Sequence, residues 1–229
     1  MNTSKLLISI LFVLLLAGCS DSDDANTSTN NEDSAHIEDE ALPQVDEVFP
    51  ELNQYLINAD SSFSIEGFEG GQTETKTDST DQNISNQTIS KYLPYLIFNA
   101  DSTYALDLVI NNYVPVEKND EIVLVEGGPD FEVGLISLRN NKRKQLLFFG
   151  TMGVVMDAKW TDNNTIMIAG ANEMNGDSIR PVIWTYDIPS KAWSVYTYDK
   201  MIAADASNFP KKWKQQKGNS EPAASLKNE

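Results

Sequence analysis

Tyr95-Leu96-Ile97-Phe98-Asn99-Ala100-Asp101-Ser102-Thr103-Tyr104 joins two apolar runs through a short turn of Asn, Asp and Ser. Residues of these types hydrogen-bond their own backbone and tolerate left-handed dihedral angles. A short turn between two apolar runs predicts a β-hairpin. Two similar stretches, residues 55–63 and 160–166, lie elsewhere in the chain and predict hairpins of the same kind.

The stretches at residues 95–104 and 160–166 are each followed by a further predicted hairpin. The first pairs residues 131–138 with 146–149, and the second pairs residues 182–188 with 193–198. Two units of four short antiparallel strands result, which makes this an internal repeat. The first unit carries extra residues at 113–126, and their apolar run predicts an added or extended strand.

Both units resemble blades of TolB-like and WD40-like β-propellers. Residues 98–104 and 160–166 are similar to the aromatic residue, polar turn and apolar strand that open a blade, and residues 183–188 are similar to its outer half. The resemblance implies a mostly β fold of antiparallel four-stranded, blade-like sheets over residues 91–200. Because two or three blades cannot close a ring of typically four to eight, we expect an incomplete propeller or a β-sandwich.

The N-terminus is typical of a secretory signal, with Lys5 followed by an apolar run that ends at Leu16-Ala17-Gly18-Cys19. These four residues resemble the lipobox of bacterial lipoproteins. The resemblance implies cleavage before Cys19, a diacylglyceryl thioether on its sulfur, and acylation of its new amino group by a chain such as palmitate. The run is shorter than the roughly 20 residues that span a membrane, so the acyl chains are the expected membrane attachment.

The residues that follow predict where the protein is located. Ser20-Asp21-Ser22-Asp23-Asp24 resembles the acidic export signal of some surface lipoproteins, and Ser20 after the cysteine is compatible with sorting to the outer membrane. An acidic linker alone would also account for this run. We expect an outer-membrane lipoprotein that is either periplasmic or surface-exposed.

Acidity is concentrated in the front half of the chain. Residues 20–82 hold 17 acidic residues and one basic residue, whereas residues 83–229 hold 17 acidic and 15 basic residues. This charge disfavours nucleic acid as a partner. Composition predicts a signal peptide (1–18), a disordered acidic linker (19–48), a partly ordered segment with a polar loop (49–83), an antiparallel β domain (84–205) and a disordered basic tail (206–229). A helical turn is expected to begin at Pro50.

The inventory of reactive side chains removes most catalytic schemes. The only histidine, His36, lies in the acidic linker, so a Ser-His-Asp triad and a Cys-His zinc site are not expected in the β domain. We therefore expect no catalytic residue, metal or cofactor. Asp130 and Glu132 leave carboxylate-based glycan hydrolysis as an alternative, although turns account for many such residues.

Four aromatic residues are the candidate binding face. Period-two alternation puts Trp184 and Tyr186 on one face of their strand, and Tyr196 and Tyr198 on one face of the next. They either belong to the core or bind a partner. Our leading hypothesis is a non-enzymatic, lipid-anchored protein whose β domain binds an envelope protein. The alternatives are a surface glycan-binding or glycan-hydrolysing lipoprotein, and self-association through exposed sheet edges.

Overall fold

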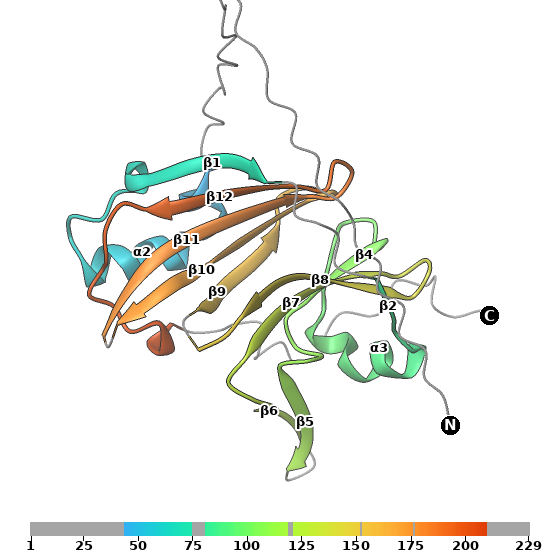
Figure 1. The fold of residues 1–229 in the computed structure, drawn as a ribbon. Helices are drawn as coiled ribbons and strands as arrows, with labels where there is room; N and C mark the ends of the chain where they lie inside the picture. Colours follow the sequence, from blue (N-terminus) through green and yellow to red (C-terminus); the bar gives the residue numbers. More distant parts are fainter. Residues whose placement is uncertain (1–43, 75–80, 119–120, 152, 176, 210–229) are drawn as a thin grey trace, which may run out of the picture. The chain divides into compact units, whose positions relative to one another are not determined.

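Two antiparallel five-stranded sheets and a separate two-stranded ribbon dominate the computed structural model (Figure 1). The structure describes residues 44–74, 81–118, 121–151, 153–175 and 177–209. All of them belong to one unit, residues 37–229. The prediction of a mostly β fold with antiparallel sheets is confirmed.

The first sheet has the strand order β2-β8-β7-β4-β3. Its strands are β2 (Gln82–Asn83), β3 (Ile97–Phe98), β4 (Tyr104–Asp107), β7 (Phe131–Ser137) and β8 (Lys142–Phe149). The second sheet has the order β1-β12-β11-β10-β9. Its strands are β1 (Phe68–Glu74), β9 (Val154–Trp160), β10 (Thr165–Asn175), β11 (Ser178–Asp187) and β12 (Ala192–Tyr198).

Each sheet contains one of the two predicted four-stranded units, because β3, β4, β7 and β8 pair consecutively, as do β9 to β12. Carboxylates stabilise the turns that open the units. Asp101 Oδ1 accepts from Thr103 N (3.0 Å), and Asp162 Oδ1 accepts from Asn164 N (2.7 Å). The predicted hairpins at residues 95–104 and 160–166 are thus confirmed.

The fifth strand of each sheet includes residues from the polar loop that the sequence predicted at 70–83. β1 pairs with β12, and β2 pairs with β8. The loop prediction is therefore wrong for residues 70–74 and 82–83. Gly70 explains why the pattern was missed: it has φ 126° at a bulge, and a Cβ there would be 2.3 Å from Val195 O. A polar, glycine-containing strand can pair through its main chain without showing apolar alternation.

Residues 55–63 do not form the predicted hairpin, because helix α2 (Pro50–Ala59) runs through most of them. Pro50 begins this helix, as expected, and Leu52 and Leu56 lie one turn apart on its buried face. A short helix, α1 (Val45–Val48), precedes it, and Val45 is buried. Ordered structure therefore begins before the expected boundary at residue 49.

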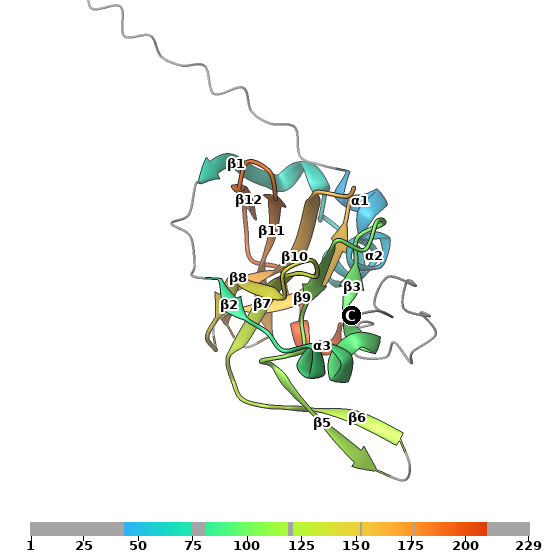
Figure 2. The same cartoon turned by 90° about the vertical axis from the view of Figure 1, so that its right-hand side faces the viewer.

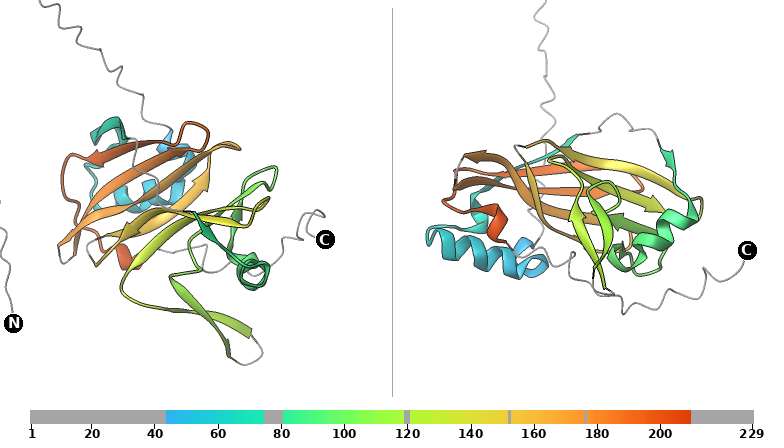
Figure 3. Two further views of the ribbon diagram at one scale, coloured as in Figure 1. Left: turned by 45° about the vertical axis from the view of Figure 1, so that its right-hand side comes forward. Right: turned by 90° about the horizontal axis from the view of Figure 1, so that it is seen from below.

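The second sheet is buried on both faces. One face packs against the first sheet. The other packs against α1, α2 and residues 202–209, which include the 3₁₀ turn η3 (Ala206–Asn208). Figure 3 shows the helices and this C-terminal segment beside the second sheet. Because Phe209 is only 4% exposed, the expected boundary of the tail at residue 206 is also wrong.

The far face of the first sheet is covered by helix α3 (Asn86–Tyr92) and the 3₁₀ turn η2 (Leu93–Tyr95). Ser85 caps α3 by accepting from Thr88 N (3.0 Å). The two sheets are also joined where their first hairpins meet: Trp160 Nε1 donates to Ile97 O (2.7 Å), and Asn99 Nδ2 donates to Asn163 O (2.9 Å). The described residues thus form two joined five-stranded antiparallel sheets that do not close on each other.

Candidate binding surfaces

The four predicted aromatic residues do not form one surface. Trp184 and Tyr186 face the first sheet, whereas Tyr196 and Tyr198 lie on the opposite side of the second sheet. Each pair shares a face, as alternation predicts, but all four side chains are 2–5% exposed. They pack as core residues because both faces of their sheet are covered.

Tyr198 illustrates the packing on the helix-covered side. Its ring lies 4.9 Å from the Phe63 ring and 5.3 Å from the Phe68 ring, measured between centroids. Its hydroxyl accepts from Ser64 N (3.2 Å). The buried phenol therefore has a polar partner, which is the usual condition for a core tyrosine.

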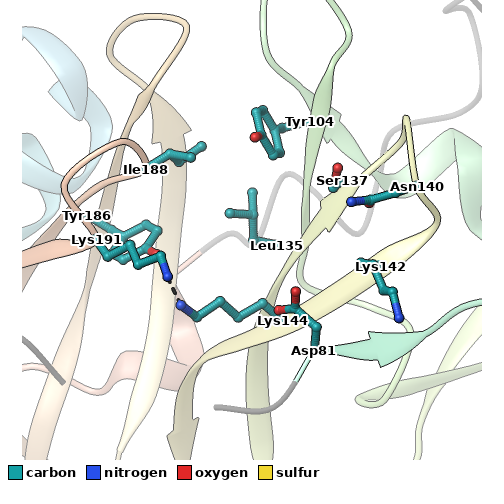
Figure 4. A pocket seen from close by; sticks show the side chains of 10 residues that line it. All are labelled: Asp81, Tyr104, Leu135, Ser137, Asn140, Lys142, Lys144, Tyr186, Ile188 and Lys191. Carbon is teal, nitrogen blue, oxygen red and sulfur yellow. Dashed lines mark hydrogen bonds between the residues drawn. The ribbon is translucent and has the colours of Figure 1, made fainter. Parts of the chain in front are cut away.

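Tyr186 also lines a pocket of about 590 Å³ between the two sheets (Figure 4). Its wall contains Tyr104 of β4 and alternate residues of β7 and β8, which pair across the strands and therefore point to the same face of the first sheet. The second sheet contributes β11 and the turn that follows it. The lining residues are Asp81, Tyr104, Leu135, Ser137, Asn140, Lys142, Lys144, Tyr186, Ile188 and Lys191.

The pocket has a basic lining in an acidic protein of net charge −17. It holds three lysines, at positions 142, 144 and 191, against one carboxylate, Asp81. Lys144 Nζ lies 3.4 Å from the Tyr186 hydroxyl and 5.8 Å from the centre of its ring. Lys142 Nζ donates to Asn83 Oδ1 (2.6 Å). These contacts position two ammonium groups on one wall of the pocket.

A second cluster of charges lies in and beside the first sheet. The Arg143 side chain is 5% exposed; its Nε donates to Asp107 Oδ2 (2.7 Å), and its Nη1 donates to Glu132 Oε1. Asp107 Oδ1 also accepts from Val109 N (2.8 Å) and Ile110 N (2.9 Å). Burial lowers the pKa of Arg143, but the two carboxylates outweigh this and leave the pKa above its ordinary value.

These contacts bear on the alternative of carboxylate chemistry. Glu132 is held by Arg143 and by Asn111 Nδ2, which donates to Oε1 at 2.9 Å. Asp130 lies exposed just before β7. The pairing of Glu132 favours a structural role for it, because a buried arginine needs such anions. Among the described residues, no group of three or more His, Cys, Asp and Glu side chains is arranged to hold a metal ion.

The ribbon of β5 (Tyr113–Lys118) and β6 (Glu121–Glu126) carries four of the six large apolar side chains that are exposed among the described residues. Val114 is opposite Val125, and Val116 is opposite Val123, so these four side chains share a face. Three of them, Val114, Val116 and Val125, are 51%, 42% and 49% exposed. We call these four residues the valine stripe.

The base of the ribbon is firmly attached. Tyr113 is 3% exposed, its carbonyl accepts from the Tyr92 hydroxyl (3.1 Å), and its ring lies 6.4 Å from that of Phe131. Figure 2 shows the rest of the ribbon extending beyond both sheets. The sequence predicted a strand here but not this surface. The sequence features that could have indicated an exposed apolar ribbon were the alternation at residues 113–116 and the apolar run at residues 122–125.

Comparisons with models of protein families, with curated proteins and with solved structures gave no match. No helix in the described part of the chain is both long and apolar enough to cross a membrane. Cys19 and the rest of the lipobox-like segment lie outside the described residues, as does the basic tail from residue 210.

Proposed function

We propose that this protein is a lipid-anchored envelope protein whose β domain binds a protein partner through the β5–β6 ribbon. The anchor is Cys19, which the lipobox resemblance identifies, and the location is the outer membrane, facing the periplasm or the exterior. The observation that carries the partner-binding role is the valine stripe. It places three strongly exposed β-branched side chains on one face.

Exposure of this kind favours a covering partner. Burying apolar surface contributes about 25 cal/mol per Å², so a partner that covers the stripe gains free energy at each valine. A two-stranded ribbon has only marginal stability by itself. Attachment through Tyr113 and Leu124, which packs against the main core, fixes the ribbon in place before the partner arrives. Such preorganisation lowers the entropic cost of binding.

The edges of the ribbon indicate how the partner docks. In the described part of the chain, no third strand pairs with β5 or β6. Gly127 N donates to Asn112 O (2.8 Å), so these two opposite residues form a hydrogen-bonded pair. Hydrogen-bonded and non-hydrogen-bonded pairs alternate along an antiparallel ribbon, so the backbone nitrogen of Pro115 points away from β6. Because proline has no N–H, the outer edge of β5 lacks a hydrogen-bond donor at this position. The outer edge of β6 is therefore the better place for an added strand. Main-chain pairing along β6 and contact with the valines would then act together.

In-cell photocrosslinking tests this function. A photoreactive amino acid is placed at Val116 on the ribbon or, as a matched control, at Ile57, which is 38% exposed on α2. We expect one discrete adduct from Val116 and none of the same mass from Ile57. An adduct of twice the chain mass would identify the partner as a second copy. Absence of an adduct at Val116, or the same adducts at both positions, would contradict the proposal.

A further inference from the structure

The pocket between the two sheets is a second candidate site, distinct from the ribbon. Its walls come from both sheets: Tyr104, Leu135 and Lys144 from the first, Tyr186 and Lys191 from the second and its β11–β12 turn. Figure 4 shows these side chains around a common space. We propose that this pocket binds an acidic saccharide, one whose sugar ring carries a carboxylate.

The charge of the lining selects an anion. Among the described lining residues, three are lysines and one is an aspartate, so basic side chains outnumber acidic ones there. Lysine ammonium groups form charge-assisted hydrogen bonds with carboxylate or phosphate oxygens. Residues 83–229, which supply most of the lining, are nearly balanced in charge, with 17 acidic and 15 basic residues, so the cluster of lysines is a local feature. Screening by salt should weaken binding at a site of this kind.

The remaining lining residues favour a sugar over a bare inorganic ion. The partly exposed Tyr104 and Ile188 provide apolar surface for the ring of a ligand, and the buried Leu135 and Tyr186 complete the apolar part of the lining. Ser137 and Asn140 provide side-chain groups that both donate and accept, which suits hydroxyls. A volume of about 590 Å³ lies within the range of roughly 300–1,000 Å³ for small-molecule sites.

Lys191 provides a substitution that separates binding from folding. It has φ 57° in the turn between β11 and β12, a left-handed conformation that glycine adopts without strain. Lys191→Gly therefore removes a pocket charge while suiting the backbone. Asn141 has φ 52° in the corresponding turn between β7 and β8 and does not line the pocket. Asn141→Gly is thus the matched control.

The test is calorimetric titration of the full-length protein in detergent with trigalacturonate, with neutral galactotriose and with inorganic phosphate. We expect saturable binding of trigalacturonate that weakens with added salt, and no binding of galactotriose. Lys191→Gly and a second variant, Lys144→Gln, should each bind roughly tenfold more weakly, since each removes a charge-assisted contact. Asn141→Gly should bind like the unaltered protein.

The proposal would be overturned if trigalacturonate did not bind saturably, or if galactotriose bound as tightly as trigalacturonate. It would also be overturned if phosphate bound and trigalacturonate did not, or if both lysine variants bound trigalacturonate with unchanged affinity. Circular dichroism of each variant checks that the sheets are retained. Because the ribbon takes no part in this site, failure here would leave the proposal of a protein partner untouched.

Discussion

The guanidinium of Arg143 on β8 lies directly over Gly134 on β7, where an added Cβ would be 2.4 Å from Nη2. The register of the two strands shifts between Val133 and Gly134, at a bulge. The missing side chain at Gly134 therefore makes room for a buried cation that pairs with both Asp107 and Glu132.

Gly134→Ala is expected to lower the free energy of unfolding by about 2–3 kcal/mol, because the new methyl group would push Arg143 away from its carboxylates. Urea denaturation followed by circular dichroism measures this. Gly128→Ala is the control, since a Cβ there would meet nothing within 4 Å. Equal stability of the two variants would show that Arg143 can move without cost.

Arg143→Met should be more destabilising, by about 3–5 kcal/mol, because it leaves Asp107 buried without its cation. Adding Asp107→Leu to the same chain should recover part of the loss, since the fully buried carboxylate is then gone and only the partly exposed Glu132 remains without its cation. The comparison is again by urea denaturation, with the exposed residue Arg139 replaced by methionine as the control. A double variant no more stable than Arg143→Met would argue against the ion pair as the source of the loss.

The turn carboxylates predict a dependence of stability on acid. Hydrogen bonds from the Thr103 side chain and backbone hold the pKa of Asp101 below its usual value, and a bond from Asn164 N is the main cause of the same shift at Asp162. A lowered folded-state pKa contributes stability that is present above the unfolded value of about 3.9 and is lost as pH falls through the folded value.

The double variant Asp101→Asn, Asp162→Asn should therefore show a smaller fall in urea midpoint between neutral pH and strongly acidic pH than the unaltered protein. Asp46→Asn, at an exposed position on α1, is the control. Identical acid profiles for all three proteins would show that the turn carboxylates do not contribute to the pH dependence.

Cys19→Ser should abolish acylation, because the serine side chain lacks the thiol that forms the thioether. Metabolic labelling with an alkyne-bearing palmitate analogue, followed by membrane fractionation, checks this. The unaltered chain should be labelled and sediment with membranes. Label retained in the variant would contradict the assignment of Cys19 as the lipid attachment site.

Turn chemistry and strand alternation were sufficient to predict the two four-stranded units. The Asp101 turn and its counterpart at Asp162 use local side-chain bonds that can be recognised from a few neighbouring residues. The added strands β1 and β2 lack such a signal, because their pairing depends on edges already formed by β12 and β8. Residues 55–63 were mistaken for a hairpin because the same turn chemistry follows a helix there: Asp60 Oδ1 accepts from Ser62 N just after α2 ends at Ala59.

The candidate sites were harder to predict than the fold. The pocket brings together Asp81, Tyr104, Leu135 and Lys191, which are far apart in the sequence and meet only after both sheets have packed. Alternation correctly paired Trp184 with Tyr186 but could not show that the first sheet covers them. Exposure of the valine stripe likewise depends on the ribbon pairing with neither sheet.

The most direct test of the central claim is quantitative affinity purification from crosslinked cells with Val114, Val116 and Val125 all replaced by threonine. Threonine has a similar shape and suits an exposed strand, so the fold should be retained. We predict that one envelope protein recovered with the unaltered chain, and with an Ile57→Thr control, is lost from the triple variant. Recovery of the same proteins in the same amounts with all three chains would contradict the role of the ribbon as the binding surface.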